Sequence, residues 1–115
     1  MSAADVIRDA LTESGLDFAE PTADQFFVKL PGTHKLFTNA WLVVGAHGLM
    51  VEAFVCRKPD ENHEEFYAFL LRRNARMFAV SFSIDKSGDV YLVGRLPLSG
   101  ITAEEVDRIL GSVLQ

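Results

Sequence analysis

The sequence predicts an α+β domain in which a mostly antiparallel five-stranded sheet packs with helices. Two patterns predict this: apolar residues alternate with polar ones in several short segments, and they recur at helical spacing in three others. Turn residues join the strand segments closely, which favours antiparallel pairing. The predicted order is helix, three strands, helix, two strands, helix. At 115 residues the chain suits one core, so we expect a single domain over residues 1–115.

The first predicted helix begins at Ser2, whose hydroxyl can cap it while Asp5 completes a capping box. Gly15 is a natural stop for this helix. Residues 16–24 follow, contain Pro21 and show no clear period. We therefore expect a connecting loop there.

The predicted strands show alternation bounded by turn residues. A proline and a glycine end the first strand at residues 31–32, and residues 45–48 form a short hairpin connection between the second and third. The five expected strands cover residues 25–30, 36–44, 49–56, 78–84 and 90–96.

The two later helices each have a recognisable start. Asp60 or Asn62 can cap the middle helix, and with Asn62 as the cap Glu65 would complete a capping box. Thr102 and Glu105 form the same pattern at the last helix, where an apolar stripe follows.

The histidines do not predict a metal site. His34, His47 and His63 lie on different predicted elements, and none forms a close pair. His63 begins a run that resembles the zinc-protease helix, but Tyr67 stands where the second imidazole is needed. We expect no metal.

Catalytic constellations are also missing from the sequence. The glycines form no phosphate-binding motif, and no serine lies in a nucleophile elbow. Cys56 ends an apolar strand and is expected to be a small core residue. The alternative is a reactive thiol, activated by Arg57 and Lys58 if Cys56 is exposed. We expect no catalytic residue, no cofactor and no enzyme activity.

The charge balance restricts the partners. The formal net charge is −5, which disfavours broad contact with nucleic acid or anionic lipid. Arg72, Arg73 and Arg76 complement the carboxyl end of a helix, although a phosphate or nucleic-acid contact is the alternative. Apolar stretches fall far short of the ~20 residues that span a bilayer. With no signal-like amino end and one cysteine, we expect a cytoplasmic protein.

The second predicted strand carries more apolar residues than one buried face requires. Phe37 and Trp41 lie on one face while leucine, alanine and valine occupy the other. An uncovered apolar face would mark a surface for a partner or a second subunit. The alternative is that helices cover both faces of the sheet.

Two runs resemble a known family. They are Pro-Asp-Glu-Asn-His at residues 59–63 and Gly-Asp-Val-Tyr-Leu-Val-Gly-Arg at 88–95. Together with nearby matches they resemble the YbjN-domain family, described as bacterial sensory transduction regulators, over about residues 26–114. The resemblance implies a fold like that of the type III secretion chaperones. It also implies a small, often dimeric protein that holds partner polypeptides and has no catalytic centre.

Four residues of the family signature lack a simple local explanation: Arg57, His63, Asn74 and Arg95. A buried arginine–aspartate pairing that fixes the middle helix is the first interpretation, and a ligand pocket is the second. We therefore expect a non-catalytic, chaperone-like or regulatory protein of bacterial signalling or stress response that forms a homodimer. It would bind a client or regulatory protein. The alternative is a small-molecule-sensing domain with a pocket around these four residues.

Overall fold

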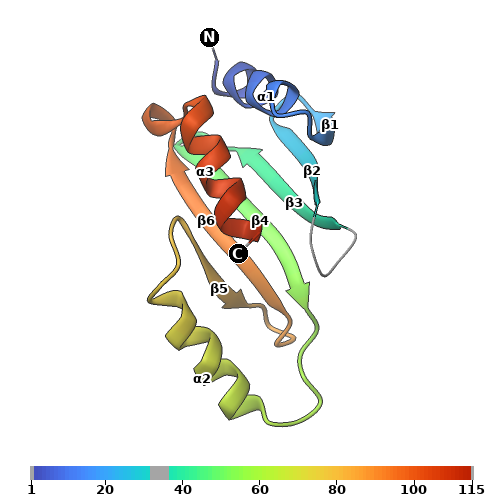
Figure 1. Ribbon diagram of the computed structural model, residues 1–115, viewed down its shortest axis with the longest axis vertical. Coiled ribbons are helices and arrows are strands. Elements are labelled where there is room, and N and C mark those ends of the chain that lie inside the picture. Colours follow the sequence, from blue (N-terminus) through green and yellow to red (C-terminus); the bar gives the residue numbers. More distant parts are fainter. Residues whose placement is uncertain (1, 32–36, 115) are drawn as a thin grey trace.

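The computed structural model describes residues 2–31 and 37–114, with the backbone alone at residues 37, 38 and 114. The predicted α+β class is confirmed, with one strand more than the five expected (Figure 1). The elements are α1 (Ala3–Glu13), β1 (Asp17–Thr22), β2 (Gln25–Pro31), β3 (Phe37–Val44), β4 (Gly48–Cys56), α2 (His63–Asn74), β5 (Val80–Ile84), β6 (Val90–Pro97), the 3-10 turn η1 (Leu98–Gly100) and α3 (Ala103–Leu114).

Within the described residues, six strands form one antiparallel sheet in the order β1-β2-β3-β4-β6-β5. β1 and β5 are therefore the edge strands. The expected hairpin between β3 and β4 is present, where the Gly45 N–H donates to the Gly48 carbonyl oxygen at 2.8 Å. α2 connects β4 to β5 and lies beside β5 at the lower end of the molecule (Figure 1).

The loop predicted for residues 16–24 is wrong, because most of this segment is β1. It pairs with β2, placing Asp17 opposite Lys29 and Phe18 opposite Val28. Only Phe18 of this strand is half-buried, so no alternation of apolar residues marks it in the sequence. Pro21 is tolerated because an edge strand has one side that needs no ladder hydrogen bond.

The helix starts follow the sequence in two cases of three. Ser2 Oγ accepts from the Asp5 N–H at 3.2 Å, which confirms the first capping box. Thr102 Oγ1 accepts from the Glu105 N–H at 3.1 Å. Asn62 is the N-cap of α2, but its φ of 59° is left-handed and its side chain makes no capping hydrogen bond. The capping box predicted there is therefore wrong.

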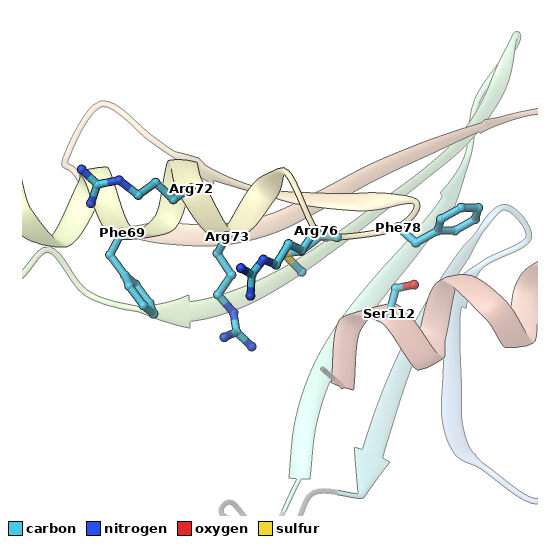
Figure 2. A pocket seen from close by; sticks show the side chains of 7 residues that line it. Phe69, Arg72, Arg73, Arg76, Phe78 and Ser112 are labelled. Carbon is cyan, nitrogen blue, oxygen red and sulfur yellow. The ribbon is translucent and has the colours of Figure 1, made fainter.

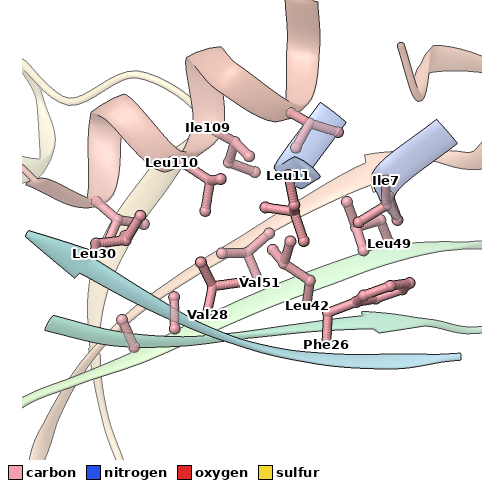
Figure 3. Packing of buried hydrophobic residues seen from close by; sticks show 14 of the residues in the cluster. Ile7, Leu11, Phe26, Val28, Leu30, Leu42, Leu49, Val51, Ile109 and Leu110 are labelled. Atoms are coloured by element: carbon pink, nitrogen blue, oxygen red, sulfur yellow. The ribbon is translucent and has the colours of Figure 1, made fainter. Parts of the chain in front are cut away.

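The core lies between one face of the sheet and helices α1 and α3, which also pack against each other (Figure 3). The fully buried ring of Phe26 and the side chains of Val28, Leu42 and Val51 project from the sheet toward these helices. The alternative that helices cover both faces of the sheet is wrong, since α1 and α3 share one face and α2 lies at the β5 edge.

Candidate functional site

The candidate site is the sheet face opposite α1 and α3. Strand residues alternate between faces, so the neighbours of the core residues project the other way. Three large side chains there remain well exposed: Trp41 at 38%, Met50 at 37% and Phe54 at 48%. We call the apolar residues of this side the open sheet face. It consists of Phe27, Trp41, Val43, Met50, Phe54, Tyr91 and Val93.

Two aromatic pairs organise the open sheet face. Phe27 and Trp41 are directly opposite on β2 and β3, and their ring centroids are 4.7 Å apart in an edge-to-face arrangement. Phe54 and Tyr91 pair in the same way across β4 and β6, at 5.5 Å. Such cross-strand contacts hold the rings in place without burying them. The face is therefore a preformed apolar surface.

Charged side chains of both signs lie among these apolar residues. Arg95 stands opposite Met50 in the β4–β6 pairing, and Glu52 stands opposite Val93. Glu52 and Arg95 are thus diagonal neighbours on one surface. Arg95 is exposed and Glu52 is half-buried.

The hydroxyl of Tyr91 stays protonated at neutral pH. Partial removal from water raises the pKa of Tyr91 above its ordinary value, and the carboxylates of Asp85 and Asp89 raise it further. The hydroxyl is hydrogen-bonded to the Asp85 side chain, so it is engaged within the chain at the edge of the open sheet face.

Of the site residues singled out in the sequence, Trp41 and Arg95 lie on this side of the sheet within the part of the chain that the structure describes. The side chain of Phe37 lies outside the described residues, as does His34. Sequence reasoning did not place Tyr91 and Val93 on the surface, because the strand order β4-β6 brings them there and short-range patterns do not reveal that order.

Asn74 closes the free edge of β5 rather than binding a ligand. The Phe82 N–H donates to Asn74 Oδ1 at 2.6 Å, and Asn74 Nδ2 donates to the Phe82 carbonyl oxygen at 3.2 Å. The side-chain amide thus replaces the backbone of a neighbouring strand. This explains why an asparagine ends α2.

The other end of α2 is fixed to the turn between β5 and β6. The Tyr67 hydroxyl donates to the Gly88 carbonyl oxygen at 2.9 Å, and the ring of His63 stacks near that of Tyr67 at 6.3 Å. His63 Nε2 donates to the Pro59 carbonyl oxygen. These contacts give His63 a structural role at the start of the helix.

The buried arginine–aspartate pairing proposed for α2 is wrong. No charged side chain is buried within residues 2–31 and 37–114, and both Arg57 and Arg95 are exposed. Polar contacts of Asn74 and Tyr67, together with the buried Leu70, attach the helix instead.

The four residues of the proposed ligand pocket are not brought together. Arg95 on β6 lies opposite Met50 on β4. Arg57 follows Met50 by seven residues, directly after the end of β4 at Cys56. At about 3.3 Å per residue, about 20 Å of strand separates the two arginines. Asn74 and His63 lie at opposite ends of α2 and are engaged by different backbone groups.

Residues 2–31 and 37–114 offer neither a cluster of metal ligands nor a membrane-spanning helix. No group of three or more His, Cys, Asp or Glu side chains there could hold a metal ion. Cys56 is a free, half-buried thiol. None of the described helices combines the length and the apolar character that a bilayer crossing requires.

The fold is like that of the type III secretion chaperones. One chain of the heterodimeric ExoU–SpcU complex from the type III secretion system of Pseudomonas aeruginosa superposes on this chain with a TM-score of 0.66 at 13% sequence identity. The match covers 92% of this chain and 87% of the other. At this identity the similarity is one of fold.

The chain belongs to the YbjN family, whose description is "putative bacterial sensory transduction regulator" and whose sequence pattern matches residues 3–115. Uncharacterized proteins of Mycobacterium leprae and Mycobacterium tuberculosis H37Rv are each 50% identical to it, over 118 and 117 residues. These matches cover 98% and 96% of this chain. The chain spans 64% and 63% of the lengths of these two relatives.

Proposed function

We propose that this chain is a non-catalytic protein-interaction module, chaperone-like or regulatory, that serves bacterial signalling or stress response as a cytoplasmic homodimer. The exposed apolar side chains of the open sheet face are the observation that carries the proposal. A contiguous apolar surface of this kind is typical of a protein–protein interface. The family description and the chaperone-like fold support the same class of function.

A second copy of the chain is the occupant that the chemistry of this face favours. A twofold interface brings the same patch of two subunits together, so the patch must complement itself. Glu52 and Arg95 provide both signs of charge on one apolar surface. Two copies facing each other can therefore place Glu52 of one subunit near Arg95 of the other. Aromatic residues and methionine between them match the composition of interface cores.

Sedimentation equilibrium of the purified protein tests this proposal. Phe54→Asp places a carboxylate on the open sheet face, where Phe54 is already partly exposed and the core is untouched. We expect a dimer for the wild type and a monomer for Phe54→Asp, because a buried unpaired carboxylate opposes association. Leu71→Asp is the matched control, since Leu71 is 69% exposed on α2, which packs at the β5 edge of the sheet.

A monomeric wild type at all concentrations, or a dimer that Phe54→Asp leaves intact, would contradict the homodimer. Circular dichroism of each variant establishes that it remains folded. If Leu71→Asp dissociates the dimer and Phe54→Asp leaves it intact, the interface involves α2 rather than the open sheet face.

A further inference from the structure

A cavity of about 370 Å³ lies where the end of α2 approaches the end of α3, away from the open sheet face. Figure 2 shows Phe69 and Arg73 projecting from the same side of α2, and Ser112 on the neighbouring turn of α3. The volume is at the small end of the ~300–1,000 Å³ common for binding pockets. Its lining residues are Phe69, Arg72, Arg73, Arg76, Met77, Phe78 and Ser112.

Part of the cavity lining is apolar and exposed to solvent. Phe69 is 54% exposed and Phe78 is 65% exposed, although both are large hydrophobic residues. The guanidinium carbon of Arg108 lies 5.8 Å from the centre of the Phe78 ring, a cation–π distance. Burying these two rings against a partner would remove apolar surface from water.

The rim of the same cavity is positively charged, against the trend of the chain. The protein has a formal net charge of −5, yet four of its eleven basic side chains lie at or beside this cavity: Arg72, Arg73, Arg76 and Arg108. Arg108 also pairs with Glu105 at 3.2 Å. None of the cavity's lining residues is acidic. Helix-end stabilisation accounts for arginines near the end of α2, but it does not require exposed phenylalanines on either side of them.

We propose that this cavity docks an acidic amphipathic helix of a partner protein. Apolar side chains of that helix would cover Phe69 and Phe78, while its carboxylates would lie against Arg72 and Arg76. Helix-in-groove recognition of this kind uses apolar anchors on one face and charge complementarity at the rim. The inference rests on the protein-binding function proposed above, and it names a second surface and the chemistry of the segment bound there.

A polypeptide fits this cavity better than a nucleic acid. The net charge of −5 repels a long polyanion, whereas a short acidic helix carries little more charge than the arginine rim can neutralise. Phosphate contacts would use the arginines and leave the exposed rings of Phe69 and Phe78 without an apolar partner.

Fluorescence anisotropy tests the proposal with a synthetic probe. The probe is a fluorescein-labelled peptide of about 14 residues, or four helical turns, with leucine and phenylalanine on one helical face and glutamate on the other. We expect saturable binding that weakens as salt is added. The double variant Arg72→Gln/Arg76→Gln should bind about fivefold to tenfold more weakly, and Phe69→Ala about tenfold more weakly.

Three controls separate this site from the others. Lys86→Gln removes one positive charge from the distant β5–β6 turn and should leave the affinity unchanged within twofold. A peptide of the same composition with its amphipathic face scrambled should bind at least tenfold more weakly. Phe54→Asp, which disrupts the open sheet face, should leave peptide binding intact even if it abolishes the homodimer.

Equal affinities for the wild type, the double glutamine variant and Phe69→Ala would overturn the proposal. So would stronger binding of labelled single-stranded oligouridine than of the peptide, because the site would then recognise polyanions. Loss of peptide binding in Phe54→Asp alone would assign the peptide to the open sheet face. That result would be consistent with the proposed protein-binding function, but it would refute the proposal that the cavity docks the peptide.

Discussion

Replacing Asn74 with alanine should loosen α2 and the β5 edge while the rest of the fold keeps its stability. The Asn74 side chain makes two hydrogen bonds to the backbone of Phe82, at 2.6 and 3.2 Å. Alanine removes both and leaves an N–H and a carbonyl of an edge strand without their partner. α2 has one buried residue, Leu70, so few other contacts compensate.

The size of the effect follows from the two bonds. Each hydrogen bond contributes about 1 kcal/mol net, because water partly replaces it when it is lost. Two bonds therefore give about 2 kcal/mol, which corresponds to an increase of about 30-fold in the population of the locally open state. The core between α1, α3 and β2–β4 contains no atom of Asn74, and its stability should change little.

Native-state hydrogen exchange resolved by residue measures this difference. In Asn74→Ala, the amides of α2 and of Phe82 should exchange about 30-fold faster, while amides of β3 and β4 keep the wild-type rate. Leu71→Ala is the matched control on the same helix. Its side chain is 69% exposed, so the change should stay within about 0.5 kcal/mol.

A uniform acceleration across the whole sheet would refute this reasoning, because α2 would then unfold only together with the core. Unchanged exchange of Phe82 in Asn74→Ala would also refute it. In that case the contact between the amide side chain and the strand edge would contribute nothing measurable.

Three further predictions concern stability. The Arg8 guanidinium lowers the pKa of Glu20, which it contacts at 2.6 Å, so the pair stabilises the fold at neutral pH and the advantage disappears as the pH falls through that lowered pKa. The melting temperature of Glu20→Gln should therefore lie below that of the wild type at pH 7, with a gap that narrows as the pH falls toward the lowered pKa of Glu20 and closes below it. Gly94→Ala should lower the free energy of unfolding in urea by about 1–3 kcal/mol, because a Cβ there would lie 2.5 Å from the Ala79 carbonyl oxygen. Gly111→Ala should instead raise it by about 0.5–1 kcal/mol, since the added Cβ meets no atom within 4 Å and alanine favours the helix. An unchanged gap at low pH, or equal effects of the two glycine variants, would contradict these explanations.

The sequence predicts a helix or strand correctly wherever one face of that element is buried in the core. The alternation in β2 and β4 and the apolar stripes of α1 and α3 record contacts with one core, so local patterns carry the information. β1 escaped prediction because an exposed edge strand has no apolar side to alternate. Asn62 adopts a left-handed backbone conformation at the start of α2. Residue preferences for capping positions do not predict that conformation.

The candidate site was only partly predictable for a similar reason. The excess of apolar residues around Trp41 indicated an uncovered face, but its extent depends on β6 inserting beside β4. Asn74 looked like a ligand contact because nothing near it in sequence explains it, and its partner Phe82 lies across a turn. The sequence explained the arginines at the end of α2 by the helix dipole, with a phosphate or nucleic-acid contact as the alternative, since their proximity to α3 exists only in the folded chain.

Fluorescence of Trp41 on dilution is the most direct measurement of whether a second copy covers the open sheet face. Trp41 is the single tryptophan of the chain, and it is 38% exposed on that face in one subunit. We predict that its emission moves to longer wavelength as the protein is diluted, and that Phe54→Asp shows the long-wavelength emission at every concentration. An emission maximum that is independent of concentration and identical in the wild type and Phe54→Asp would contradict the proposed homodimer.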